Sequence, residues 1–162
     1  LRGMKIDNPN LVWSTDFTYI PMPYGYMYLA AVVDWHSRFV LSWTLSNTMD
    51  YIFCLDALTD ALEHGEPVIF NTDQGSQYTS EHFTQPLLER QILISMDGRG
   101  RALDNVFIER VWRSVKYENI YSNDYQSVSE LRDGLANYFD EYNHRRPHQA
   151  LDYATPAEVH YG

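Results

Sequence analysis

Apolar and polar residues alternate over three segments near the start of the chain, and this pattern predicts three β-strands. The segments are rich in β-branched and aromatic side chains. Pro21, Pro23 and Gly25 mark a turn after the first of them. Strands joined by such short links pair with their neighbours, so we expect an antiparallel meander. The three expected strands cover residues 11–20, 26–33 and 38–45.

The apolar spacing then changes to the three- and four-residue period of amphipathic helices. A helix over residues 48–64 is expected to bury Ile52 and Leu58, and Gly65 and Pro67 end it. Two short apolar segments are typical of buried parallel strands. The later elements are strands at 68–71 and 92–96, helices at 81–91 and 105–121, and a last helix capped by Ser127 and Glu130. The sequence therefore predicts an α/β fold with a mixed five-stranded sheet, three antiparallel strands then two parallel, and helices on both faces.

Composition narrows the class of protein. The chain has 162 residues, 44% of them hydrophobic and 21% charged, which excludes a disordered protein. The single cysteine, Cys54, excludes an internal disulfide and a thiolate zinc cluster. No apolar run is long enough to span a membrane, and no secretion signal is visible. We therefore expect a cytoplasmic protein without zinc.

The net charge of −10 argues at first against binding to nucleic acid. Its distribution is uneven, because residues 99–116 carry five basic side chains and two acidic ones. Residues 1–10 form a polar lead-in that begins without Met, as expected of a fragment with a basic DNA-binding segment upstream. We expect a core at residues 11–146 and a C-terminal segment, 147–162, that packs on it.

Three carboxylates stand out as candidate chemistry. Asp16 lies within the first strand, where an unpaired charge is costly. Asp73 follows a short buried strand, and ligands gather at the carboxyl ends of strands in open α/β sheets. Glu109 lies on the helix that follows a glycine-containing loop, off its core stripe and in line with Arg113 and Lys116.

Each acid alone also has an ordinary structural explanation. Asp16 could bond a neighbouring group, Asp73 could cap a helix, and Glu109 could pair with Arg113 on a solvated face. Two carboxylates on neighbouring strands and a third on a facing helix instead form an oxygen cage suited to Mg²⁺ or Mn²⁺. Two such ions about 3.5–4 Å apart can promote phosphodiester chemistry.

The spacing and the surrounding residues resemble a known family. From Asp73 to Glu109 is 109 − 73 = 36 positions, so 35 residues lie between them. This is similar to the Asp, Asp, 35, Glu signature of retroviral integrases and insertion-sequence transposases, and nearly the whole chain resembles the IS-three family of bacterial elements. The matching segments are WSTDFTY from Trp13, DQGSQY from Asp73, ERVWRSVK from Glu109, YNHRRPHQAL from Tyr142 and TPAE from Thr155.

The resemblance implies a ribonuclease-H-like fold and a transposase catalytic domain. Asp16, Asp73 and Glu109 become the catalytic residues and the ligands of Mg²⁺ or Mn²⁺, with two ions expected. Water would cut a phosphodiester at the end of a mobile element, and the freed 3′-hydroxyl would attack target DNA. A homodimer or higher assembly is expected, since two ends must react together. Candidate DNA contacts are Arg99, Arg101, Arg113, Lys116, Arg145 and Arg146.

Two other functions remain open at this point. A ribonuclease-H-type nuclease would only hydrolyse, and a catalytically silent domesticated domain would only bind DNA. Asp34 could be a fourth ligand, although a turn bonded to Ser37 is the more ordinary explanation. His144 and His148, beside the two arginines at 145 and 146, could contact phosphate or simply pack on the core.

Overall fold

A computed structural model describes residues 3–96 and 106–162. Within them, no helix combines the length and hydropathy that crossing a bilayer requires. The elements in chain order are β1 (Val12–Met22), β2 (Gly25–Asp34), β3 (Val40–Ser46), α1 (Tyr51–Leu62), β4 (Ile69–Thr72), α2 (Ser76–Thr79), α3 (Glu81–Glu89), β5 (Leu93–Met96), α4 (Val106–Val115), η2 (Lys116–Ile120), α5 (Tyr121–Asn123), α6 (Val128–His144), η3 (Gln149–Leu151) and α7 (Pro156–Tyr161).

The strands form one mixed sheet in the order β3-β2-β1-β4-β5. β1, β2 and β3 pair antiparallel, while β4 runs parallel to both β1 and β5. This confirms the predicted mixed five-stranded sheet. Its two halves meet at β1, which pairs with β2 over Trp13–Met22 and with β4 only over Val12–Ser14.

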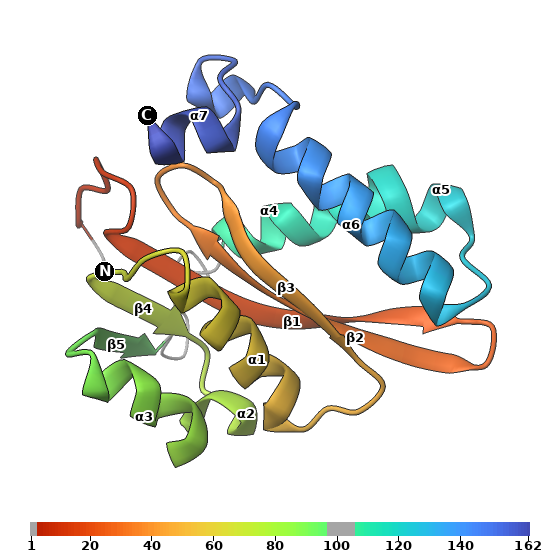
Figure 1. Ribbon diagram of the computed structural model, residues 1–162, viewed down its shortest axis with the longest axis horizontal. Coiled ribbons are helices and arrows are strands. Elements are labelled where there is room, and N and C mark those ends of the chain that lie inside the picture. Colours follow the sequence, from red (N-terminus) through yellow and green to blue (C-terminus); the bar gives the residue numbers. More distant parts are fainter. Residues whose placement is uncertain (1–2, 97–105) are drawn as a thin grey trace.

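Each face of the sheet is covered by helices, as expected (Figure 1). On one face α1 and α3 pack on Trp13, Ala30 and Phe70. On the other face α4 and α6 pack on Leu29 and Ala31. Because successive side chains of a strand point to opposite faces, the odd- and even-numbered residues of β1 serve different cores. Asp16 therefore faces α4.

Local differences from the expected boundaries have identifiable causes. β1 continues through Pro21, which a central strand would not tolerate, because this part of β1 lies beyond the β4 ladder and is an edge. α1 begins only at Tyr51, capped by the Asp50 carboxylate, which accepts from the Ile52 N–H at 3.0 Å. This turn leaves Ile52 52% exposed, so its expected burial is wrong. The π-helical turn η2 after α4 was not expected either.

A buried polar network ties the C-terminal helix to the β2–β3 turn. Asp34, fully buried, accepts from the N–H of Asn10 and from the N–H and hydroxyl of Ser37, each at 2.8 Å. The Ser37 hydroxyl also lies 2.9 Å from Nδ1 of His160 in α7, whose ring stacks on Phe39 at 5.0 Å. Asp34 is thus the predicted turn residue rather than a fourth ligand at the acidic site.

Candidate active site at the β1–β4 edge

The parallel ladder between β1 and β4 brings two of the predicted acids together. Val12 pairs with Ile69 and Ser14 with Asn71, a constant difference of 57 positions. Continuing this register by two residues sets Asp16 beside Asp73, because 16 + 57 = 73. Asp73 immediately follows the last residue of β4, so its side chain lies at the carboxyl end of the strand, as predicted.

The turn after β4 fixes the Asp73 carboxylate. Its Oδ1 accepts from the backbone N–H of Gly75 at 2.7 Å. A Cβ at position 75 would lie 2.9 Å from the same oxygen, closer than side-chain atoms normally approach. Glycine at this position therefore lets the backbone hold the carboxylate, a role that the sequence motif alone did not indicate.

The third acid is held on the facing helix. Glu109 is exposed on α4, one turn before Trp112, and residues at this separation are neighbours on a helix surface. The indole Nε1 of Trp112 donates to Oδ2 of Asp16 at 3.3 Å. Trp112 was predicted only as a core residue. It also connects α4 to β1 at the acidic site, and no sequence signal separates the two roles.

Burial and neighbouring charges act together on Asp16. Desolvation is the largest effect, and with the nearby Asp73 and Glu109 carboxylates it raises the pKa of Asp16 to about 6. The N–H of Phe17 and the indole of Trp112 oppose this shift but do not cancel it. The site therefore holds more negative charge than its own hydrogen bonds balance, which favours a bound cation.

The raised pKa of Asp16 predicts that Asp16→Asn stabilises the metal-free protein at neutral pH. The folded pKa of about 6 exceeds the unfolded value of 3.8, so between these values the native state binds more protons. The free energy of unfolding of the unsubstituted protein then falls as pH rises from 4 to 6, by about 2–3 kcal/mol. Denaturant melts in EDTA at pH 4 and pH 8 measure this. An equal pH dependence of the free energy of unfolding in Asp16→Asn and in the unsubstituted protein would contradict the prediction.

Two buried polar side chains precede the two aspartates along β1 and β4. Ser14 and Asn71, which pair across the β1–β4 ladder, are both fully buried. The Ser14 hydroxyl and both amide atoms of Asn71 lack a hydrogen-bond partner within the described residues. Buried polar atoms of this kind are normally satisfied by water or an ion. Their place, two residues before each aspartate, suits a hydrated cation site.

The three acids have donor atoms that suit a hard cation, but their side chains do not lie close enough together to share one. Asp16, Asp73 and Glu109 offer carboxylate oxygens, which Mg²⁺ and Mn²⁺ prefer. Across residues 3–96 and 106–162, however, no three His, Cys, Asp or Glu side chains gather closely enough to hold a metal ion. An ion held by all three acids thus requires their side chains to come closer together.

Of the predicted DNA contacts, Lys116 lies at this site. Its Nζ donates to the Thr18 hydroxyl at 2.7 Å, and partial burial lowers its pKa while Asp16 acts in the opposite direction. Arg113 is exposed on α4, one turn after Glu109. Arg99 and Arg101 lie outside the described residues.

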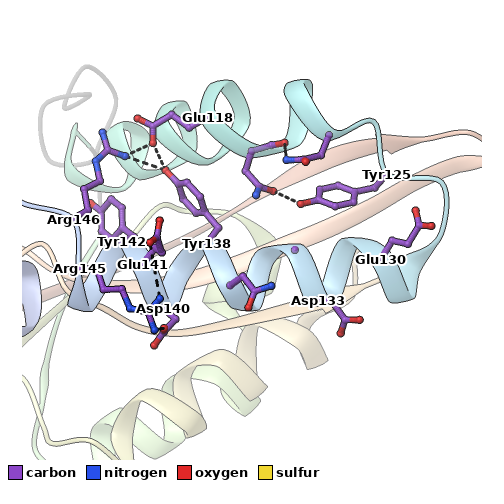
Figure 2. Close-up of a pocket in the computed structure, with 14 residues that line it drawn as sticks. Glu118, Tyr125, Glu130, Asp133, Tyr138, Asp140, Glu141, Tyr142, Arg145 and Arg146 are labelled. Atoms are coloured by element: carbon purple, nitrogen blue, oxygen red, sulfur yellow. Dashed lines mark hydrogen bonds and ion pairs between the residues drawn. The ribbon is translucent and has the colours of Figure 1, made fainter.

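The other two candidate arginines lie along a groove between α6 and the η2–α5 segment (Figure 2). Arg146 pairs with Glu118, which also accepts from the Tyr138 hydroxyl at 2.6 Å. Arg145 pairs with Asp140 at 3.2 Å. None of the three catalytic candidates lines this groove. The structure therefore does not bring these arginines to the carboxyl site.

The chain is similar in sequence to bacterial insertion-sequence transposases. The chain is 35% identical over 158 residues to the transposase for insertion sequence element IS904 of Lactococcus lactis, covering 95% of this chain and 62% of that protein. It is 32% identical over 160 residues to the IS629 transposase of Shigella sonnei, covering 98% of this chain and 54% of the relative. The chain thus spans little more than half the length of these curated relatives.

Solved structures confirm the fold. A simian T-cell lymphotropic virus intasome in complex with PP2A regulatory subunit B56 gamma contains a chain that superposes with a TM-score of 0.82 at 21% identity, covering 96% of this chain and 55% of that one. The HTLV-2 integrase catalytic core domain in complex with magnesium superposes with a TM-score of 0.78 at 18% identity, covering 98% of this chain and all of the other. The fold is ribonuclease-H-like, as expected.

Family models give the same assignment. One model described as "Integrase core domain" matches residues 7–102, more than half of the chain, and a second with the same description matches residues 90–156. Together they cover the sheet and both helical layers. The chain belongs to the integrase core domain family.

Proposed function

We propose that this chain is the catalytic part of a transposase, which hydrolyses a phosphodiester at the end of a mobile element and then joins the freed 3′-hydroxyl to target DNA. The observation that carries the proposal is that the β1–β4 register, continued by two residues, sets Asp16 beside Asp73, and that the charges of Asp73 and of Glu109 on α4 both act on the Asp16 carboxylate. The similarity to insertion-sequence transposases supports the same reaction class.

Mg²⁺ or Mn²⁺ is the proposed cofactor, with Asp16, Asp73 and Glu109 as its ligands and two ions per site. When bound, such ions supply a stronger oxygen nucleophile and stabilise charge on the leaving oxygen. The chain's own contribution is to orient the carboxylates: Gly75 holds Asp73, and Trp112 holds Asp16. No side chain is required as a nucleophile.

The proposed substrate is DNA, at the element ends and at the target. Lys116 lies next to Asp16 along the site and is proposed to contact a phosphate near the reacting bond, with Arg113 beside it on α4. A homodimer or higher assembly is proposed because two ends are joined in one event. We further propose residues 11–146 as the catalytic core and 147–162 as a segment that supports it.

Strand joining on a preformed branched DNA in the presence of Mn²⁺ tests the proposal. A branched substrate already holds the reacting strands together, so it depends least on recognition of a particular sequence. Joined product on a denaturing gel supports a transposase. Cleaved strands without joining would identify a ribonuclease-H-type nuclease, and DNA that is bound but unchanged would identify a silent domain.

A further inference from the structure

Exposed tyrosines gather around the end of the β1–β2 hairpin, whose turn carries the fully exposed Tyr24. Four others form two ring pairs, and we call these four the tyrosine surface: Tyr19, Tyr26, Tyr117 and Tyr121, whose exposed fractions are 56%, 58%, 70% and 60%. β1 continues past β4 here, so the hairpin extends beyond the parallel half of the sheet (Figure 1). Contiguous exposed apolar groups commonly mark a binding surface.

The tyrosines occur as two edge-to-face pairs. The rings of Tyr19 and Tyr26 are 5.5 Å apart at 82°, and those of Tyr117 and Tyr121 are 5.3 Å apart at 85°. A pocket of about 390 Å³ separates Tyr121 from the hairpin residues Ile20–Pro23, so the second pair borders the hairpin across a hollow. Edge-to-face contact leaves ring faces available for stacking.

Lys116 connects this surface to the carboxyl site. Its Nζ lies 5.4 Å from the centroid of the Tyr19 ring and also bonds the Thr18 hydroxyl. Thr18 is two residues after Asp16 on the same face of β1, a distance of about 7 Å along a strand. Lys116 thus lies between the ring of Tyr19 and the face of β1 that carries Asp16.

We infer that the tyrosine surface binds unpaired nucleotides of the DNA strand that enters the carboxyl site, with bases stacked on the tyrosines and a phosphate on Lys116. The inference rests on the proposed function. Aromatic rings bind single-stranded bases because every base offers a π-face, whereas paired bases in a duplex are covered by their neighbours. With one or two cations nearby, stacking rather than charge provides most of the affinity.

Binding of a duplex with a five-nucleotide unpaired tail, compared with a blunt duplex of the same length, tests this inference. The tailed duplex is expected to bind more tightly, and Tyr19→Ala or Tyr26→Ala to weaken the tailed complex about 5- to 100-fold with little effect on the blunt one. Tyr19→Phe keeps the ring and is expected to bind normally. The salt dependence of the tail's contribution is expected to be shallow, about −0.7 per phosphate on logarithmic axes.

Tyr153→Ala is the matched control, because Tyr153 is 69% exposed but lies in the C-terminal segment. A 2-aminopurine base in the tail gives a direct readout, since stacking on tyrosine quenches it. Equal affinity for tailed and blunt DNA, or equal loss in the Tyr153 variant, overturns the inference. The inference is also overturned if Tyr19→Ala changes only self-association and leaves binding of the tailed duplex unchanged. Strand joining that depends on Asp73 but not on the tyrosines would leave the proposed function standing alone.

Discussion

Asp73→Asn is expected to lower the rate of DNA strand joining at least about a thousand-fold, because a metal-binding carboxylate contributes several kcal/mol to the transition state. Asparagine has the same shape, and its side-chain oxygen can still accept from the Gly75 N–H. The variant therefore removes charge while leaving the turn after β4 intact. Rates measured on branched DNA with Mn²⁺, together with a thermal melt of each protein, separate lost chemistry from lost folding.

Asp16→Asn and Glu109→Gln belong to the same test. If the three acids act as one unit, a double variant is no slower than either single variant, because such effects are strongly non-additive. Asp133→Asn is a suitable control, since Asp133 is exposed on α6 and lines the groove away from the acids. A rate for Asp73→Asn within tenfold of the unsubstituted protein would falsify the assignment of this residue.

The largest loss of stability is expected from Asp34→Ala, about 3–5 kcal/mol in the free energy of unfolding. The substitution leaves the Asn10 N–H and the Ser37 N–H and hydroxyl buried without this acceptor. It also removes one of the contacts between α7 and the β2–β3 turn, because His160 lies 3.7 Å from the same carboxylate. Urea denaturation at pH 7 measures the difference, and Asp56→Ala on the exposed face of α1 serves as control.

The effect of Asp34 on stability depends on pH with the sign opposite to that of Asp16. Burial alone raises the pKa of Asp34, but the nearby His160 ring and the hydrogen bonds from Ser37 and Asn10 outweigh it and hold the pKa below its usual value. Its stabilisation is therefore present above the unfolded pKa of about 4 and is lost as pH falls through the lower folded value. The stability gap between Asp34→Ala and the unsubstituted protein should thus narrow below pH 4. A stability difference that stays constant below pH 4 would contradict an ionised Asp34 carboxylate in the folded protein.

Much of the fold could be predicted because its determinants are local. Alternation predicted the strands, and the three- and four-residue period predicted the helices. The two aspartates could be assigned because each lies within or directly after a strand whose apolar pattern is clear. Ile52 was misplaced because the Asp50 cap starts α1 at Tyr51, three residues later than the expected start at residue 48. Local patterns do not determine that choice of first turn.

Contacts between distant segments were the part that the sequence could not supply. Trp112 fits a core stripe equally well with or without its bond to Asp16, which is 96 residues away. Arg146 was a candidate DNA contact because it lies in a cluster of basic residues and histidines within a motif that resembles the family. Its partner Glu118 lies 28 residues earlier, on a π-helical turn that no pattern indicated. Such pairs form only when α4 and α6 have packed on the same face of the sheet.

The β1–β4 ladder has a consequence for how this site can change during evolution. The register of this ladder sets the first two acids side by side, so the segment between them can gain or lose loop residues without moving either carboxylate. A single-residue insertion within β1 before Asp16 would instead turn its side chain to the opposite face of the sheet. Distant relatives should therefore differ freely in the interval between the two aspartates, and searches that require a fixed interval would overlook them.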